Sequence, residues 1–205
     1  RYIHTMLNNI VSSIFHVDDL DVLEYLVDDG LQIEPTYYVP IIPMILVNGA
    51  VGIGTGFSTN VPCYNPKDLI EYCKCMINKT PVNELKPWFR NFKGTVTSDS
   101  TKGVYKKINK TKLEITELPI GYWTEDFKNH LEAYIEKYPK VIKDFERHYT
   151  EKEVKIIIQF TTSEILDDML KYDDVKNCTK IEHELKLVST RCVNTGNMHL
   201  YDKNN

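Results

Sequence analysis

Residues 34–62 read EPTYYVPIIPMILVNGAVGIGTGFSTNVP, and the order of the chain is set by this stretch. Its first half is apolar from residue 37 to residue 47 but contains Pro40 and Pro43, which exclude an ordinary helix there. We therefore expect an extended, buried segment. The second half contains four glycines, at positions 49, 52, 54 and 56. Glycine allows positive φ or a close approach of something else to the backbone.

A single bulky aliphatic side chain, Ile53, stands between Gly52 and Gly54. Two interpretations are open: a core strand that ends in a tight turn with Ile53 folded inward, or a loop that presents Ile53 to a partner. A phosphate-binding P-loop fits poorly, because no Gly-Lys-Ser/Thr follows the glycines. A dinucleotide fingerprint also fails, because the Gly52 to Gly56 spacing is one residue short of GxGxxG. A nucleotide-binding enzyme is therefore the weakest interpretation.

Composition sets broader limits. The 205 residues are 42% hydrophobic, enough for one or two cores, and the formal net charge is −4. That charge argues against a generally basic nucleic-acid binder but leaves room for a local basic groove. The sequence lacks a twenty-residue apolar run, so we expect no membrane partner. Five cysteines without a CxxC pair predict reduced intracellular thiols rather than zinc. Because the chain opens on Arg1, without methionine or a signal peptide, we expect it to be a piece of a larger polypeptide.

Residues 34–62 resemble the signature of the eukaryotic type IIA DNA topoisomerases, which reads close to EPxxYxPIIPMxLxNGAxGIGTGxSxxIP. Three more segments are similar to motifs of that family. Residues 1–7, RYIHTML, resemble its Arg-Tyr-Ile-x-Thr-x-Leu run. Residues 91–95, NFKGT, match its Asn-Phe-Lys-Gly-Thr, and residues 117–124, ELPIGYWT, resemble Glu-Leu-Pro-x-x-x-Trp-Thr. The resemblance covers nearly the whole chain.

The resemblance implies a catalytic pair at the start of the chain, with Tyr2 as nucleophile and Arg1 as its transition-state stabiliser. A phenolate oxygen can attack a DNA phosphorus and hold the strand end as a phosphotyrosine, which conserves the phosphodiester energy. Tyrosine has an ordinary pKa of about 10, so it needs nearby positive charge or a base. A guanidinium can contact the nonbridging oxygens and offset the developing charge. The family's Mg²⁺ site, in a TOPRIM domain, and its ATP site are implied to lie outside this chain.

The same resemblance implies DNA contacts. Ile53 falls on the isoleucine that enters the duplex, with Gly52, Gly54 and Thr55 around it, and Lys93 lies in the Asn-Phe-Lys-Gly-Thr motif. Residues 185–202 read as a strand, a turn at residues 194–196 and a second strand. Short donors and cations in this stretch suit phosphates rather than base edges: Lys186, Ser189, Thr190, Arg191 and Asn194. A solvated hairpin is the alternative, and the spacing before Met198 departs from the family.

Hydrophobic periodicity predicts further elements. We expect helices over residues 1–16, 19–28 (with Gly30 as a stop), 66–79 (capped by Asn65), 124–138 (capped by Thr124) and 163–171. We expect strands within residues 95–118, with a turn at residues 109–110, and over residues 154–160.

These expectations combine into an α+β fold. Residues 1–58 are predicted to be the C-terminal part of a winged-helix cleavage domain, and residues 59–205 an α+β tower domain. The resemblance implies a homodimer of the parent polypeptide that passes one double-stranded DNA through a break in another. Val51 stands where the cellular enzymes usually have Glu, and Phe57 where they usually have Trp. A divergent member, such as one from a large cytoplasmic DNA virus of asfarvirus type, would fit; location would then be the host cytoplasm, and otherwise the nucleus. The rival hypothesis is a non-catalytic DNA-binding or scaffold fragment in which Tyr2 is structural.

Overall fold

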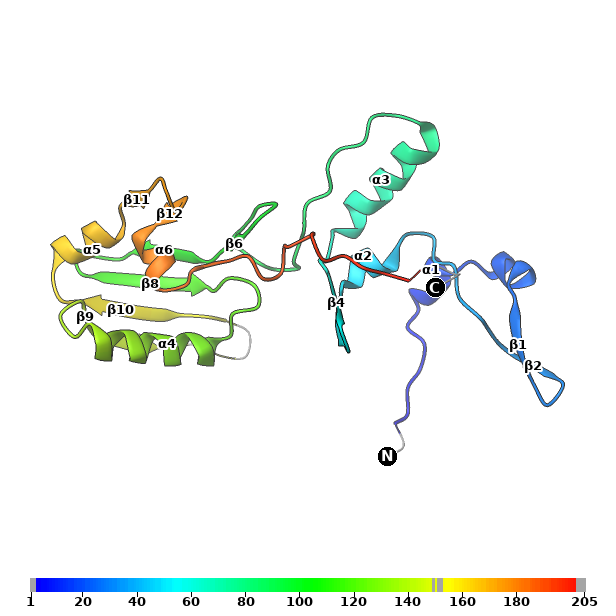
Figure 1. Ribbon diagram of the computed structural model, residues 1–205, viewed down its shortest axis with the longest axis horizontal. Coiled ribbons are helices and arrows are strands. Elements are labelled where there is room, and N and C mark those ends of the chain that lie inside the picture. The colour runs from blue at the N-terminus through cyan, green and yellow to red at the C-terminus, as the bar shows by residue number, and fades with distance from the viewer. Residues whose placement is uncertain (1–2, 149, 151–152, 202–205) are drawn as a thin grey trace. The chain divides into compact units, whose positions relative to one another are not determined.

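The computed structural model describes residues 3–148, 150 and 153–201. The chain divides into two compact units. Unit 1 contains Arg1–Gly49 and Tyr64–Leu85, and unit 2 contains Ala50–Cys63 and Lys86–Asn205. The ribbon in Figure 1 shows the elements of each unit. The predicted boundary at residue 58 refers to domains of the parent polypeptide and stays a prediction.

Unit 1 is built from short elements. They are α1 (Val11–Ile14), the 3-10 helix η1 (Val17–Val22), β1 (Tyr25–Asp28), β2 (Leu31–Pro35), α2 (Met44–Asn48) and α3 (Pro66–Asn78). The helix predicted over residues 1–16 is wrong in the part that the structure describes, where only α1 is helical. Ile3, Met6 and Leu7, which would form its apolar face, are exposed. A short helix without a packing partner is marginal in water, so the periodic pattern alone does not make one.

The helix predicted over residues 19–28 is also wrong. η1 is followed by an antiparallel hairpin of β1 and β2, in which Asp28 pairs with Leu31. The two residues of its turn, Asp29 and Gly30, both have positive φ, 49° and 79°. An Asp-Gly pair favours this turn because both positions need the left-handed region. Gly30 therefore closes a hairpin, where the sequence suggested the end of a helix.

The proline-containing stretch is non-helical up to Pro43, as predicted, but its predicted burial is wrong. Tyr37, Val39 and Ile41 are exposed, and α2 begins directly after Pro43. Within unit 1 the stretch is held by main-chain hydrogen bonds, including one from Ile41 N to Ile14 O at 2.9 Å.

The start of α3 is as predicted. The side chain of Asn65 accepts from Lys67 N, Pro66 occupies the first turn, and Lys79 ends the helix in the left-handed conformation. Of its predicted apolar stripe, however, only Leu69 is buried, whereas Met76 and Ile77 are exposed.

Unit 2 contains a hairpin, larger and smaller sheets, and three helices. Its strands are β3 (Ala50–Gly54), β4 (Phe57–Val61), β5 (Thr95–Val96), β6 (Thr101–Lys102), β7 (Val104–Lys107), β8 (Lys112–Glu117), β9 (Ile142–Arg147), β10 (Ile156–Phe160), β11 (Tyr172–Asp173), β12 (Cys178–Thr179) and β13 (Val188–Ser189). Its helices are α4 (Thr124–Lys137), α5 (Ser163–Met169) and α6 (Lys180–Glu184). The main sheet has the antiparallel order β7-β8-β10-β9, and a smaller one has the order β13-β6-β5. Helices and antiparallel strands in one unit confirm the α+β class.

The core of unit 2 follows from alternation along β8 and β10. Ile156 pairs with Ile115, and Ile158 with Leu113, so these apolar side chains share one face of the sheet. Buried residues of α4, α5 and α6 complete the same core: Phe127, Leu131, Leu166, Met169, Ile181 and Leu185. Figure 1 shows α4 running along the sheet.

The residues between these positions carry charge. Glu114 of β8 forms ion pairs with Lys106 at 2.7 Å and Lys155 at 3.4 Å. The hydrogen bond from Lys106 holds the pKa of Glu114 below its usual range.

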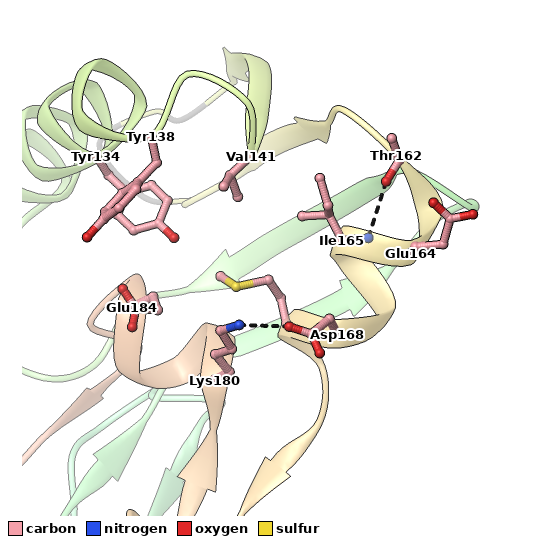
Figure 2. A pocket seen from close by; sticks show the side chains of 10 residues that line it. Tyr134, Tyr138, Val141, Thr162, Glu164, Ile165, Asp168, Lys180 and Glu184 are labelled. Carbon is pink, nitrogen blue, oxygen red and sulfur yellow. Dashed lines mark hydrogen bonds and ion pairs between the residues drawn. The ribbon is translucent and has the colours of Figure 1, made fainter.

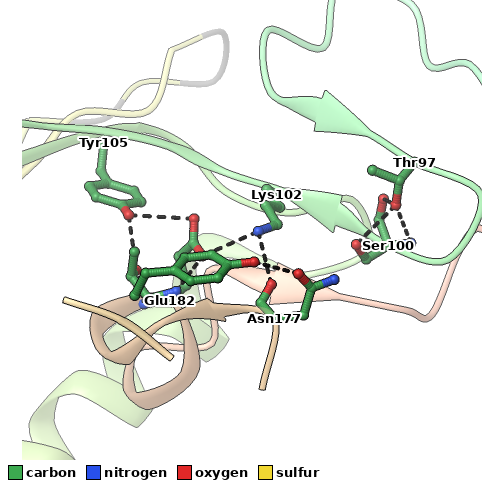
Figure 3. Close-up of polar contacts among 8 residues, drawn as sticks. Thr97, Ser100, Lys102, Tyr105, Asn177 and Glu182 are labelled. Atoms are coloured by element: carbon green, nitrogen blue, oxygen red, sulfur yellow. Dashed lines mark hydrogen bonds and ion pairs between the residues drawn. The ribbon is translucent and has the colours of Figure 1, made fainter. Parts of the chain in front are cut away.

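A polar network joins the small sheet to α6 (Figure 3). Lys102 of β6 contacts Glu182 at 3.3 Å, and the Tyr105 hydroxyl lies 3.0 Å from the Thr179 hydroxyl. Thr179 and Glu182 also form the capping box of α6. Burial raises the pKa of Tyr105, which keeps its hydroxyl neutral. Because β13 pairs with β6, this network fixes the start of the segment that follows α6.

Candidate nucleic-acid interface

Ile53 stands near the tip of the β3–β4 hairpin. The register pairs Ile53 with Ser58 and Gly54 with Phe57, which leaves Thr55 and Gly56 as a two-residue turn. Gly56 has φ of 79°, a conformation that glycine adopts without strain. The side chain of Ile53 is 90% exposed. The interpretation in which it folds inward is therefore wrong, and the hairpin presents it outward.

The two glycines beside Ile53 are not required by the packing of the chain itself. Neither has positive φ. A Cβ atom on Gly52 would meet Thr59 Cγ2 at 3.6 Å, and one on Gly54 would meet Phe57 O at 3.9 Å, both ordinary contacts. The absence of side chains at these positions instead leaves both flanks of Ile53 open to a close approach from outside.

The hairpin predicted over residues 185–202 is wrong. Its first strand is reduced to β13, and residues 197–199 bond to β4 instead of forming a second strand with β13: Asn60 N donates to Asn197 O at 2.8 Å. The turn at residues 194–196 is present, because Asn194 Oδ1 accepts from Gly196 N at 2.8 Å. The Asn194 oxygen is therefore used inside the turn, which leaves its amide nitrogen for an external acceptor. A strong edge on β4, with its free main-chain groups, accounts for the different pairing.

The predicted cations Lys186 and Arg191 line one hollow of about 520 Å³ together with Ser189 and Thr190. Lys186 is exposed and has φ of 54°, directly after α6. Arg191 Nη1 donates to Gly121 O at 3.5 Å, and Arg191 N donates to Ser189 Oγ at 3.3 Å. The structure thus brings these four predicted residues together.

Tyr122 belongs to the same hollow and was not singled out by the sequence. Its hydroxyl is buried and has no hydrogen-bond partner among the described residues. Burial, and next the charge of Asp126, raise the pKa of Tyr122 to about 12, so the hydroxyl keeps its proton. It is a donor available to an acceptor that enters the hollow.

Lys93 lies at a different part of the unit, in a segment held by tight packing. Its N–H donates to Glu117 Oε2 at 3.4 Å, and its side chain is exposed. A Cβ atom on the following Gly94 would lie 2.0 Å from Lys102 O, so only glycine fits there. In the described part of the chain Lys93 and Lys186 form no ion pair, whereas Lys106 is paired within the main sheet.

Comparison with known proteins agrees with this geometry. The family model of DNA gyrase/topoisomerase IV matches residues 1–204. The chain belongs to the type IIA DNA topoisomerases. It is similar to DNA topoisomerase 2 of Plasmodium falciparum, 40% identical over 100% of this chain and 14% of the relative. It is also similar to the probable DNA topoisomerase 2 of Dictyostelium discoideum, 46% identical over 64% of this chain and 9% of the relative.

A solved structure is similar as well. The crystal structure of the Plasmodium falciparum topoisomerase II DNA-binding, cleavage and re-ligation domain matches with a TM-score of 0.79 and 39% identity, over 94% of this chain and 26% of that one. This topoisomerase chain thus spans 9–14% of the length of the curated relatives named above.

The predicted catalytic pair of the topoisomerase chain, Arg1 and Tyr2, lies outside the described residues. Among the residues that the structure describes, no group of three or more His, Cys, Asp or Glu side chains could hold a metal ion. The described side chains therefore do not fit the Mg²⁺ that these enzymes generally use, and its binding residues are not assigned in this chain. No described helix is long and apolar enough to cross a membrane.

A further hollow of about 730 Å³ lies between α4, α5 and α6 (Figure 2). The rings of Tyr134 and Tyr138 form one wall, with centroids 4.9 Å apart. Asp168 lies in it, bonded to Lys180 at 2.7 Å, with Glu164 and Glu184 nearby. Hydrogen bonds from Lys180 and Lys171 lower the pKa of Asp168 to about 2. A wall that carries three carboxylates is unfavourable for a phosphate, so this hollow is not part of the candidate interface.

Proposed function

We propose that this chain forms part of the DNA breakage-reunion core of an ATP-dependent type II DNA topoisomerase. The observation that carries the proposal is the match, over 94% of the chain, to a DNA-binding, cleavage and re-ligation domain. The exposed Ile53 between two open glycines supports it from the geometry, because such a tip suits entry into a duplex.

In the proposed reaction the phenolic oxygen of Tyr2 forms a bond to a DNA phosphorus. The bond from that phosphorus to the 3′ oxygen breaks, and the 3′ oxygen leaves as a hydroxyl after taking up a proton. The strand end is then held as a 5′-phosphotyrosine, and the reverse attack by the 3′ hydroxyl reseals the strand without ATP. Arg1 would bind the nonbridging oxygens while their charge develops.

The role proposed for Ile53 is to enter between base pairs from the minor groove and to bend the duplex. Partial unstacking costs a few kcal/mol per step, and wider contact with the bent DNA offsets this cost. Gly52, Gly54 and Thr55 would lie against the groove, and Lys93, Lys186 and Arg191 against phosphates, with Ser189, Thr190 and Asn194 as donors.

The remaining parts of the enzyme are proposed to lie elsewhere in the parent polypeptide. They are the Mg²⁺ site in a TOPRIM domain, the ATPase site, and the surfaces that form a homodimer. The chain itself would supply the nucleophile and part of the DNA surface.

The test is covalent trapping of DNA on the intact protein. Wild type, mixed with end-labelled duplex and quenched with denaturant, should retain label at a DNA 5′ end, and Tyr2→Phe should retain none while it binds duplex almost as well. Arg1→Ala should bind nearly as well but cleave about 10²–10³-fold more slowly, the usual effect of losing one oriented donor. Near-normal trapping by Tyr2→Phe would instead favour a scaffold fragment with a structural tyrosine.

A further inference from the structure

Three apolar side chains lie around one hollow together with Ile53. They are Phe57 at the start of β4, Leu200 and Tyr201, with exposed fractions of 77%, 57% and 83%. The hollow has a volume of about 580 Å³. Single exposed apolar residues need no explanation, but several around one hollow mark a contact surface.

Hydrogen bonds attach residues 197–201 to the outer edge of β4. The Thr59 hydroxyl donates to His199 O at 2.7 Å and accepts from His199 N at 3.1 Å. Asn197 Nδ2 donates to Ser58 Oγ at 3.0 Å, and Asn197 O accepts from Asn60 N at 2.8 Å. The segment is thus held as an extra strand beside the hairpin, and Thr59 holds the residue directly before Leu200.

The lining of this hollow is suited to DNA in its charge. It consists of glycine, apolar, hydroxyl and histidine residues and carries no carboxylate among the described residues. Three other hollows in the described part of unit 2 contain carboxylates: Glu164 in one, Asp126 in another and Asp144 in the third. In a chain with 29 acidic residues, a carboxylate-free apolar hollow next to Ile53 matches the walls of a minor groove, where sugars are flanked by phosphates.

We propose that residues 197–201 form a third strand of the DNA-bending hairpin, and that Phe57, Leu200 and Tyr201 pack on the sugars of the duplex step that Ile53 opens. This inference rests on the proposed function. The occupant of the hollow is the minor-groove wall of double-stranded DNA. Thr59 is a positioning residue: it does not touch DNA but fixes the strand that carries Leu200 and Tyr201.

The effect of Thr59 can be separated from general stability. Thr59→Val keeps the shape of the side chain and removes both hydrogen bonds to His199, whereas Thr59→Ser keeps a hydroxyl there. Loss of a hydrogen bond that orders a segment changes an equilibrium by roughly threefold to tenfold. We therefore expect Thr59→Val to lower the ratio of bent to straight bound duplex by about that factor, and Thr59→Ser to restore it.

The experiment uses the intact protein and a duplex with donor and acceptor dyes at its ends. Resonance energy transfer reports the bend, and anisotropy reports binding. The matched control is Thr161→Val, since the Thr161 hydroxyl donates to Val141 O at 3.1 Å in the same unit, away from the hairpin. Tyr201→Ala is the second variant, because it leaves Thr59 and its bonds in place. It should lower the bent fraction as Thr59→Val does, with binding changed less than about threefold.

Bending by Thr59→Val and Tyr201→Ala equal to that of wild type would overturn the inference. The proposed function is judged separately, from Tyr2-dependent trapping in the same samples, so each can fail without the other. Hydroxyl-radical labelling of Tyr201 supplies an independent result. Protection on adding duplex supports the inference, whereas labelling that duplex leaves unchanged, or protection that depends only on protein concentration, contradicts it.

Discussion

At the scale of single residues, the environment of Ile53 departs most from what a folded chain does with a large aliphatic side chain. Isoleucine is among the residue types most often found fully buried, yet this one is 90% exposed between two glycines. The hairpin does not need the glycines for backbone conformation or for space. The cost of exposing the side chain has no return within the chain, and a return through DNA contact accounts for it.

Ile53→Ala should therefore leave the fold unchanged and reduce both the bend angle of bound duplex and the rate of cleavage. The exposed side chain makes few contacts within the chain, so thermal unfolding should shift little. Energy transfer between dyes on the duplex ends measures the bend. Val51→Ala is the matched control, since Val51 is an exposed aliphatic residue of the same strand. Wild-type bending by Ile53→Ala would remove the wedge from the proposed function.

Asp168 allows a test of electrostatics at the same scale. Hydrogen bonds from Lys180 and Lys171 lower the pKa of its carboxyl in the folded protein to about 2, from an ordinary 3.8. Because the folded pKa is the lower one, the ionised carboxyl stabilises the fold fully above pH of about 4, and this contribution disappears as pH falls through about 2. Asp168→Asn should lower the urea midpoint at pH 6 and leave it nearly unchanged at pH 2.

Glu164→Gln is the control for Asp168, because Glu164 lines the same hollow and forms no ion pair with a described residue. Its effect on the urea midpoint should be small and independent of pH. An equal loss for Asp168→Asn at pH 6 and pH 2 would mean that shape, rather than charge, matters there.

At the scale of elements, sequence patterns predicted unit 2 better than unit 1. β8, β10 and α4 were predicted to within a few residues, because the alternating or helical apolar face of each packs on the others in the same chain. The helices predicted over residues 1–16 and 19–28 failed for different reasons. The first has an apolar face that nothing in the described part of this chain covers, and the second contained a turn signal, Asp29-Gly30, that was interpreted as a helix stop.

The candidate site divides in the same way. A resemblance of motifs placed Ile53 and the cations, and the structure brings Lys186, Ser189, Thr190 and Arg191 around one hollow. Local patterns do not indicate that residues 197–199 join β4, since this pairing connects segments far apart in the chain. Tyr122 was missed because nothing in its neighbours marks a buried hydroxyl without a partner among the described residues.

The Asn-Phe-Lys-Gly-Thr segment provides the prediction at this scale. A Cβ atom on Gly94 would lie 2.0 Å from Lys102 O and 2.4 Å from the Phe92 ring, so Gly94→Ala must displace main chain. We expect a loss of about 1–3 kcal/mol, the usual effect of overpacking, measured by urea unfolding. Gly52→Ala is the contrasting variant, because its Cβ atom would meet only an ordinary contact at 3.6 Å. It should unfold near the wild-type midpoint yet weaken DNA bending, and equal unfolding losses in both variants would contradict this assignment.

At the scale of the whole molecule, the distribution of charge matters more than its sum. The net charge is −4, but many lysines of unit 2 are neutralised locally: Lys106 by Glu114, Lys107 by Asp167 and Lys180 by Asp168. Lys186 and Arg191 differ, since neither forms an ion pair with a described carboxylate and both line one hollow. A chain with excess acid can bind a polyanion where its unpaired cations are gathered.

Replacing Lys186 and Arg191 together with alanine should therefore weaken duplex binding by the same factor on unrelated sequences, because phosphate contacts carry no sequence information. Each lost contact releases about one counterion fewer, so the slope of log K against log salt should flatten by about two units for the double variant. Lys106→Ala with Lys107→Ala is the matched control. It removes the same charge from the same unit, but from lysines already paired with Glu114 and Asp167. If the effect were one of net charge alone, both double variants would change the slope equally. A flattening confined to Lys186 and Arg191 would locate the phosphates at the hollow beside Tyr122, and an unchanged slope would leave both as ordinary surface charges.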